Sequence, residues 1–511
     1  MYTRDMRLRF LLLLFLSAAA FPADFTATFL HVNDTHDRIE PTVIQGKPYG
    51  GMPRLATLIN RYRETDPNPI VLHAGDAFQG TFYFNVYEGL ADVAFLNALH
   101  LDAMAVGNHE FDKGPATLGA FARNAQFPLV SANLDVSAEP ALQSRIRGSV
   151  IVTRGTERIG IVGGITDTLP TISSPGPNVR LRELNASLQS EIDALTRQGI
   201  NKIVLLTHIG YEEEQQLART LHNVDVIVGG HSHTLLGTTT APGWPDARGP
   251  YPTVVDNPDQ GKTIVVQSWE GEKVLGRVQV TFDEQGRVTR WSTTQPVMVD
   301  ETVAEDATLH TLVEAFQKPL LQQRDRKVGS AAEAIPQNAA MGELIADAML
   351  AATAKQGAVA ALMNIGGVRA ALEPGDITYG AALSVQPFNN TLVVMDVSGA
   401  QLQQALEDIV EASRFRVLWI SAGSSYALDP TQPAGRRVTE LMIAGKPVDR
   451  NATYRITTNN FVAGGGDGVE TLKSAKGYRY DTGMIDSDAF IDYIAAHSPL
   501  RAKIENRVDR K

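Results

Sequence analysis

The sequence Gly107-Asn108-His109-Glu110-Phe111-Asp112 follows an apolar run, residues 103–106, that is typical of a buried strand. We therefore expect its polar side chains at the end of a strand. An asparagine amide oxygen next to an imidazole on one short loop suits a hard cation beside a phosphoryl group. The pair alone is a weak indication, because Asn–His pairs also occur in ordinary turns. Four further stretches of similar chemistry in the first half of the chain support the interpretation of this pair as part of a metal site.

Length, charge and cysteine content exclude several classes of protein. The chain has 511 residues, a formal net charge of −11 and no cysteine. A chain of this length is expected to form roughly two or three domains. The lack of a basic tract argues against a nucleic-acid polymer as partner. Without cysteine the chain has no disulfide, thiolate zinc site, cysteine nucleophile or lipoprotein anchor.

Residues 1–23 have the pattern of a secretory signal peptide. Arg4, Arg7 and Arg9 precede an apolar run over residues 10–20, which ends in three small alanines. Cleavage after Ala23 is an alternative to cleavage after Ala20, and an uncleaved anchor is disfavoured because the run is too short to span a bilayer. We expect a periplasmic or secreted protein without stable membrane insertion.

From residue 24 onward, apolar β-rich runs alternate with helical segments, which predicts an α/β fold with sheets sandwiched by helices. Around residue 300 the pattern changes. Apolar residues at helical spacing predict a linker helix over about 303–323, and a separate α+β unit follows. The predicted domains are therefore residues 24–300 and 325–511, joined by a linker at 301–324.

Seven side chains with ligand chemistry suited to divalent cations fall at predicted strand ends in the first unit. A single such histidine would more often be a hydrogen-bonded structural residue, but the joint arrangement predicts two adjacent metal ions that share a carboxylate. The mixture of Asp, Asn and His does not choose among Mn, Zn, Co and Fe. The seven residues are Asp34, His36, Asp76, Asn108, His208, His231 and His233.

These motifs resemble, in order and spacing, the calcineurin-like metallophosphoesterases. The stretches are Asp34-Thr35-His36, Gly75-Asp76, Gly107-Asn108-His109-Glu110, Thr207-His208 and Gly230-His231-Ser232-His233. The resemblance implies a four-layer sandwich of two sheets flanked by helices. It also implies that Asp76 bridges two metals, one held with Asp34, His36 and His233 and the other with Asn108, His208 and His231.

The same resemblance implies that His109 acts at the transferring phosphoryl group and that Asp112 orients it. An imidazolium held by a carboxylate can stabilise phosphoryl oxygens or protonate a leaving oxygen. A turn carboxylate is the alternative role for Asp112, and Glu110 is interpreted as a buried hydrogen-bonding partner of the loop. The expected reaction is attack of a metal-bound water on phosphorus. Six further histidines are interpreted as structural: His31, His73, His100, His222, His310 and His497.

Three stretches of the second unit, residues 364–369, 386–390 and 460–468, combine glycines with aromatic and polar side chains. On residue type alone, ligand binding and a role as core aromatics and turn glycines are equally good interpretations. Residues from about 327 to 488 resemble the C-terminal domain of the secreted 5′-nucleotidases. That resemblance implies that Phe388 and Phe461 sandwich a nucleobase. It also assigns Asn364 and Arg369 to phosphate or ribose oxygens, Asn390 to the base and Asp467 to the ribose hydroxyls.

The second unit departs from the family before the helix that is predicted to begin near residue 341. Relatives usually carry basic residues there that grip the substrate phosphate, whereas residues 333–340 contain no Arg or Lys. Arg369 is then the only phosphate-binding arginine carried over, which puts the affinity for 5′-phosphates in question. Asn389 in place of the usual glycine is a smaller change.

The expected function is that of a periplasmic nucleotide phosphohydrolase, a 5′-nucleotidase that could also act on UDP-sugars or 2′,3′-cyclic nucleotides. The linker helix would act as a hinge between the two units. The nearest rival is a thiosulfate-pathway hydrolase that cleaves a sulfur adduct from a carrier protein. A non-catalytic nucleotide receptor is the rival from another class. The preferred base, the native metal and the oligomeric state stay open.

Overall fold

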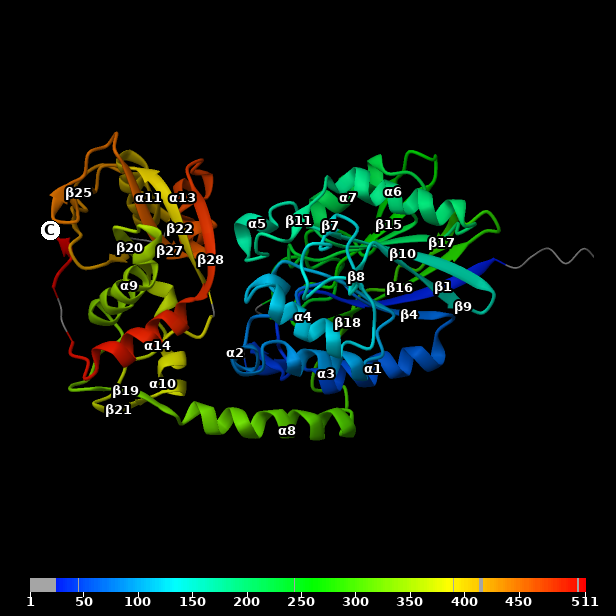
Figure 1. The fold of residues 1–511 in the computed structure, drawn as a ribbon, viewed down its shortest axis with the longest axis horizontal. Coiled ribbons are helices and arrows are strands. Elements are labelled where there is room, and N and C mark those ends of the chain that lie inside the picture. Colours follow the sequence, from blue (N-terminus) through cyan, green and yellow to red (C-terminus); the bar gives the residue numbers. More distant parts are fainter. Residues whose placement is uncertain (1–23, 45, 243, 389, 413–416, 503–504) are drawn as a thin grey trace, which may run out of the picture.

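Helix α8 (Ala307–Arg324) runs along one side of the molecule and joins two domains (Figure 1). The structure is a computed structural model that describes residues 24–44, 46–242, 244–388, 390–412, 417–502 and 505–511. The predicted signal peptide lies outside the described residues. Within them, no helix combines the length and the apolar character needed to cross a membrane.

The first domain is built around two sheets. One contains strands in the order β17-β16-β1-β4-β5-β6-β8, with β18 beside β16. Strands β1, β4, β5, β6 and β8 run parallel to one another. Their bounds are β1 Phe25–Val32, β4 Pro69–His73, β5 Ala103–Ala105, β6 Leu129–Val130, β8 Ile146–Arg147, β16 Val274–Phe282, β17 Val288–Trp291 and β18 Val297–Met298.

The other sheet has the order β14-β15-β13-β12-β10-β9, with β10, β12, β13 and β15 parallel. Strands β9 and β10 form an antiparallel hairpin. The bounds are β9 Ser149–Arg154, β10 Glu157–Ile165, β12 Ile203–His208, β13 Val226–Val228, β14 Thr253–Asp256 and β15 Lys262–Val266.

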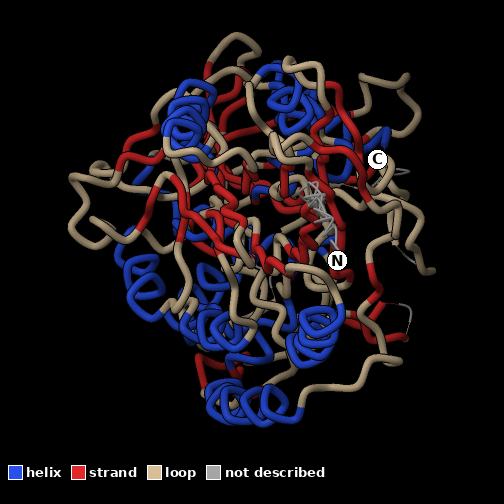
Figure 2. Tube along the Cα trace, turned by 90° about the vertical axis from the view of Figure 1, so that its right-hand side faces the viewer, coloured by secondary structure: helices blue, strands red, loops and turns tan. Residues whose placement is uncertain are grey.

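The two sheets pack face to face and helices cover their outer faces, which confirms the predicted four-layer α/β arrangement. Phe29 and Leu72 of the first sheet share one buried core with Ile161 and Leu205 of the second. In the view of Figure 2 the strands gather in the middle, with helices above and below. The helices of this domain are α1 Met52–Thr65, α2 Phe82–Tyr87, α3 Leu90–Ala98, α4 Pro115–Asn124, α5 Leu169–Ile172, α6 Leu184–Arg197 and α7 Tyr211–Thr220.

Helix α8 begins at Ala307, four residues later than the hydrophobic spacing predicts, because Asp306 caps it. The Asp306 carboxylate accepts hydrogen bonds from the backbone N–H groups of Thr308 and Leu309, at 2.9 and 3.0 Å. Its buried residues Leu309 and Leu320 belong to the core of the first domain. The helix is therefore packed on that domain along its length.

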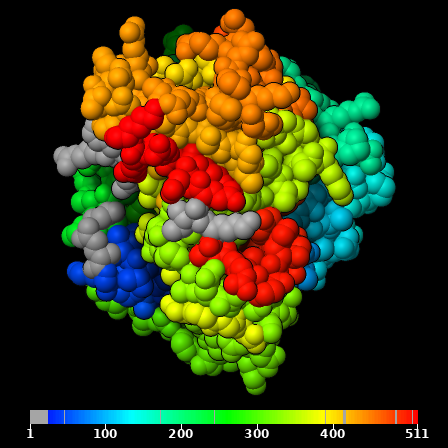
Figure 3. Space-filling view, turned by 90° about the vertical axis from the view of Figure 1, so that its left-hand side faces the viewer, coloured from blue at the N-terminus to red at the C-terminus, as the bar shows by residue number. Residues whose placement is uncertain are grey.

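The second domain has a core of its own between helices and a five-stranded sheet of order β23-β20-β27-β22-β28. A four-stranded sheet, β26-β25-β24-β29, lies beside it, and the red C-terminal segment crosses the outer face of this domain (Figure 3). The strands of the two sheets are β20 Ala360–Asn364, β22 Thr391–Ser398, β23 Leu418–Ile420, β24 Ser425–Leu428, β25 Val438–Ile443, β26 Lys446–Pro447, β27 Thr453–Asn459, β28 Arg479–Ile485 and β29 Val508–Arg510. The helices are α9 Ala339–Thr353, α10 Tyr379–Val385, α11 Gly399–Ala412, α12 Asn460–Ala463, α13 Glu470–Ser474 and α14 Asp486–His497.

Two-stranded ribbons complete the fold. These are β2 (Thr42–Ile44) with β3 (Lys47–Tyr49), β7 (Leu134–Asp135) with β11 (Arg180–Leu181), and β19 (Lys327–Ala331) with β21 (Gly375–Thr378). The two domains also touch directly. The ring of Phe82 on α2 lies 5.1 Å from that of Tyr379 on α10, and the Asn85 amide lies 3.4 Å from Asp488 on α14.

Candidate active site

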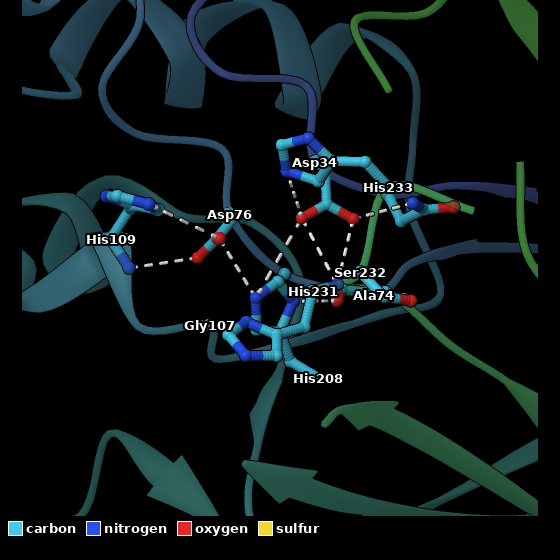
Figure 4. Close-up of polar contacts among 12 residues, drawn as sticks. Asp34, Ala74, Asp76, Gly107, His109, His208, His231, Ser232 and His233 are labelled. Atoms are coloured by element: carbon cyan, nitrogen blue, oxygen red, sulfur yellow. Dashed lines mark hydrogen bonds and ion pairs between the residues drawn. The ribbon is translucent and has the colours of Figure 1, made fainter. Parts of the chain in front are cut away.

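The five predicted motifs meet at one edge of the first domain. Those after β1, β4 and β5 come from neighbouring strands of one sheet, and those at β12 and β13 come from neighbouring strands of the other. Parallel strands present their carboxyl ends at the same edge of a sheet, so the packing of the two sheets brings the loops together. Figure 4 shows the resulting cluster, with Asp34 and Asp76 facing His208 and His233.

Asp34, His36 and His233 form the first group of side chains that could hold a metal ion. The Nε2 atoms of His36 and His233 lie 3.0 Å apart, and His233 Nε2 is 3.2 Å from Asp34 Oδ1. The Nδ1 atoms of these rings face only acceptors, namely the Phe78 and Gln79 carbonyls for His36 and the Glu270 carboxylate for His233. With Nδ1 as the donor, Nε2 is the nitrogen that each ring, when neutral, can offer to a cation, and the two Nε2 atoms face each other.

Asp76, His208 and His231 form the second group. His208 donates from Nδ1 to the Ala74 carbonyl at 2.8 Å, and its Nε2 lies 2.9 Å from Asp76 Oδ2, where the ring, when neutral, can bind a cation. The amide oxygen of Asn108 is buried and has no hydrogen-bond partner among the described residues. Buried carboxylate, amide and imidazole groups that converge in this way suit a divalent cation, and the residues present fit one in each group.

Backbone strain marks the same positions. Asp34, His36, Asp76, His231 and His233 all have positive φ angles, between 48° and 79°. For residues with a Cβ atom this region costs about 1–3 kcal/mol each and persists only where the surroundings impose it. The strained loops aim the side chains inward at the expense of local stability.

Electrostatics keeps the two carboxylates ionised. Burial opposes the charge on Asp34, but the positive charges of His233 and His208 outweigh it and lower the pKa of Asp34 to about 2. For Asp76, burial is likewise outweighed, chiefly by His208 and His109, and its pKa falls well below the ordinary value. The site holds two buried carboxylates bordered by imidazoles, and the ionised carboxylates attract cations.

His109 forms, with His36 and Asp76, a third group of side chains that could hold a metal ion, and it is held from two sides. Its backbone N–H donates to Asp76 Oδ1 at 2.9 Å, and its Nδ1 donates to Asp112 Oδ2 at 2.6 Å. Burial disfavours the imidazolium, yet the charges of Asp112 and Asp76 raise the pKa of His109 to about 10. An imidazolium is thus presented next to the candidate metal ligands, as the sequence predicts.

Glu110 is fully buried and ties two loops together. Its carboxylate accepts backbone hydrogen bonds from Gly107, Asp76, Ala77 and Phe78, at 2.6 to 3.2 Å. This confirms its interpretation as a buried partner of the loop. The histidines interpreted as structural lie outside both groups; His73, for example, bonds to Thr35 and to the Gly75 N–H.

The second domain contains a cavity of about 290 Å³ whose walls include most of the residues predicted to bind substrate. Phe388 and Phe461 both line it, and they are 50% and 48% exposed, so they are not core aromatics. The amide of Asn364 donates to Asp467 Oδ2 at 2.7 Å, which orients the carboxylate. The lining residues are Asn364, Gly366, Gly367, Phe388, Asn390, Phe461 and Asp467.

Comparison with known proteins identifies both halves of the chain. The family model of the calcineurin-like phosphoesterases matches residues 27–235, and that of the 5′-nucleotidase C-terminal domain matches residues 321–474. The 5′-nucleotidase of Diplobatis ommata is 33% identical over 95% of this chain and 90% of that protein. The chain belongs to the 5′-nucleotidase family. It is a 5′-nucleotidase-like phosphoester hydrolase with groups of His and Asp suited to metal ions.

Solved structures agree with the family. A 5′-nucleotidase precursor from Thermus thermophilus is 41% identical, with a TM-score of 0.68, over 95% of this chain and 99% of that one. The NAD nucleotidase of Haemophilus influenzae is 28% identical, with a TM-score of 0.76 and the same coverage. The chain thus shares the full two-domain layout of 5′-nucleotidases.

Among the residues predicted to bind substrate, Arg369 is the one that does not line the cavity. Its guanidinium lies 5.5 Å from the centre of the Phe388 ring, at the margin. Gln337, from the stretch without basic residues, donates to the Val368 carbonyl at 2.8 Å and so lies beside it. The stretch 333–340 therefore places an amide beside Arg369, where the family resemblance implies basic residues.

Three side chains that contact the predicted site residues were not predicted from the sequence. Ser173 donates to Asp112 Oδ1, Glu270 accepts from His233, and Asn33 donates to Asp34 Oδ2 at 2.6 Å. None belongs to a motif that predicts metal or phosphate chemistry. Asn33 and Glu270 adjoin strand ends, but only the packed structure shows which ligand each one orients.

Proposed function

We propose that this 5′-nucleotidase family member is an exported enzyme that uses two divalent metal ions to hydrolyse nucleotides to nucleoside and phosphate. The observation that carries the proposal is the pairing, in one chain, of two converging imidazole–carboxylate groups with a cavity lined by two exposed aromatic rings. The first suits phosphoester hydrolysis and the second suits a flat base.

Asp34, His36 and His233 would hold one ion, and Asn108, His208 and His231 the other. Asp76 lies against His208 and within reach of His109, and we assign it as the bridge. When bound, the two ions would supply positive charge to the phosphoryl oxygens and lower the pKa of a nearby water. The Glu270 carboxylate and the Ala74 carbonyl would keep the rings in the metal-binding tautomer.

His109 is assigned to the reacting phosphoryl group. Because Asp112 occupies Nδ1, the proton on Nε2 is the one available to a substrate oxygen. That nitrogen lies 3.9 Å from Asp76 Oδ2, on the side of the metal groups. From there it can donate to a phosphoryl oxygen or to the departing ester oxygen.

The second domain would choose the substrate. Phe388 and Phe461 would stack on the base, Asn390 would contact its edge, and Asp467 would accept from ribose hydroxyls. Asn364 and Arg369 would meet ribose or phosphate oxygens. Since the cavity and the metal groups belong to different domains, we assign α8 a hinge role in bringing them together.

The decisive experiment is hydrolysis of a panel of esters, in which both free phosphate and the organic products are measured, with Mn²⁺, with Zn²⁺ and with a chelator. The panel holds AMP, UMP, ATP, UDP-glucose, NAD, cyclic 2′,3′-AMP and p-nitrophenyl phosphate. NAD is included because a relative is named as a NAD nucleotidase. We expect chelator-sensitive release that favours nucleotides over p-nitrophenyl phosphate.

Other outcomes would point to the rivals. Hydrolysis of p-nitrophenyl phosphate alone would mean that the second domain recognises something other than a nucleotide, as in a hydrolase acting on a sulfur adduct of a carrier protein. Nucleotide binding without phosphate release by metal-loaded protein would indicate a receptor. Export is tested separately by fractionation, with loss of residues 1–23 from the mature protein as the expected result.

A further inference from the structure

The hydroxyl of Ser173 lies directly behind the pair formed by His109 and Asp112. Its Oγ donates to Asp112 Oδ1 at 2.8 Å, while Asp112 Oδ2 accepts from His109 Nδ1 at 2.6 Å. Ser173 is 1% exposed, so no solvent competes for its hydroxyl. The three side chains form a continuous hydrogen-bonded row that ends at the imidazole.

Each oxygen of the Asp112 carboxylate therefore has its own donor. A buried carboxylate with one unpaired oxygen is destabilised by desolvation. It can also rotate about its terminal torsion angle, because the energy of that torsion varies little over a wide range of angles. The bond from Ser173 fixes the plane of the carboxylate, so that Oδ2 stays in line with His109 Nδ1. The orientation of the imidazole is thus linked, through Asp112, to a residue outside the candidate metal groups.

Ser173 is itself held by its own segment. It follows helix α5, and its backbone N–H donates to the carbonyl of Leu169 at 3.1 Å, with Leu169 fully buried. Helix α5 lies against strand β28 of the second domain. The hydroxyl therefore reaches Asp112 from a segment that is packed on both domains.

We infer that Ser173 is a positioning residue for catalysis, which acts on His109 through Asp112. The inference rests on the proposed role of His109. Asp112 and Ser173 together restrict the imidazole to the orientation in which Nε2 faces the metal groups. Removing the hydroxyl lowers the fraction of enzyme with His109 in place, which lowers kcat and leaves substrate binding and metal binding unchanged.

The test is a double-mutant cycle with Ser173→Ala, Asp112→Asn and the combined variant, assayed for phosphate release from AMP with saturating Mn²⁺. Ser174→Ala is the matched control, because it makes the same change in the next residue of the segment. We expect Ser173→Ala to lower kcat about 5- to 20-fold, with KM and metal content within about twofold of the unmodified enzyme. Ser174→Ala should leave kcat unchanged.

The cycle separates positioning from a general structural effect. If Ser173 acts through Asp112, Ser173→Ala changes kcat less than about twofold when Asp112→Asn is already present. Equal losses in both backgrounds, or no loss from Ser173→Ala alone, overturn the inference. Should Ser173→Ala fail to fold, Ser173→Cys keeps the volume and a weak donor, and an intermediate kcat that is non-additive with Asp112→Asn is then expected.

One further variant distinguishes a failure of the role of Ser173 from a failure of the proposed role of His109. His109→Ala tests whether the imidazole takes part at all. Full activity in His109→Ala would remove the proposed role of His109 and this inference with it. Loss of activity in His109→Ala and Asp112→Asn, with Ser173→Ala unaffected, would overturn the role of Ser173 alone.

Discussion

At the scale of single residues, His109 is the side chain whose removal separates binding from turnover. It lies beside the metal groups without belonging to either imidazole–carboxylate pair that we assign as ligands. We expect His109→Ala to retain metal and to lose about 100- to 10,000-fold in kcat, the range typical of a general acid or base. Metal content by mass spectrometry and phosphate release measure the two effects. Normal turnover in this variant would remove the imidazole from the mechanism.

The aromatic ring of Phe461 should matter only to substrates that carry a base. Stacking on one ring contributes about 1–3 kcal/mol, so Phe461→Ala should lower kcat/KM for AMP about 10- to 100-fold. p-Nitrophenyl phosphate should change less than about threefold. Tyr478→Ala, at another aromatic that is 48% exposed, is the matched control and should change neither substrate. Equal losses on both substrates would contradict a base-binding role for Phe461.

At the scale of elements, Glu110 links the loop after β5 to the loop after β4 through four backbone hydrogen bonds. Glu110→Gln replaces one acceptor oxygen by an amide that faces N–H donors. We expect a loss of about 3 kcal/mol in the free energy of unfolding and weaker metal binding, measured by denaturant titration and metal titration. Glu88→Gln, at an exposed carboxylate, should change neither quantity. Unchanged stability of Glu110→Gln would show that the loops do not depend on this link.

Helix α7 contributes a buried carboxyl group, Glu214, that accepts from the Gln267 amide and the Gly230 N–H. Burial raises the pKa of Glu214 to about 8 from an ordinary value near 4.5. Between these pH values the folded state holds a proton that the unfolded state has lost, so stability falls as pH rises. Glu214→Gln cannot ionise and should escape this loss.

Between pH 5 and pH 8 the unmodified protein should therefore lose more unfolding free energy than Glu214→Gln does. The expected gain of the variant relative to the unmodified protein is on the order of a few kcal/mol. Denaturant titration of metal-free protein at both pH values measures it. A difference that does not depend on pH would mean that Glu214 ionises normally in the folded state.

At the scale of the whole molecule, the two domains have separate cores, and among the described residues Phe82 is the side chain that packs against both. Metal binding should therefore stabilise the first domain and leave the second nearly unchanged. Mn²⁺ at about 100 times its Kd should add about 2.7 kcal/mol to the first domain. Calorimetry with and without chelator should show one transition shifted and one fixed. The Phe461→Ala variant, altered only in the other domain, should show the same shift.

The sequence by itself determined the layered α/β pattern, the linker helix and the loops that carry the candidate ligands. It could do so because strand and helix periodicity and turn chemistry are local, and because parallel strands place their carboxyl ends together. The predicted end of a helix was less accurate where a capping residue sets it, as Asp306 does at the start of α8. From the sequence, Phe388 and Phe461 could equally belong to the core or to a binding surface. The tertiary structure places both on the wall of a cavity.

Only the tertiary structure decided how the site is assembled. His36 and His233 are far apart in the chain, and their Nε2 atoms meet because two sheets pack face to face. The sequence showed no sign of the contacts that Ser173 and Glu270 make with this site. A hydrogen bond between distant residues depends on where the backbone carries them, and no local pattern records that position.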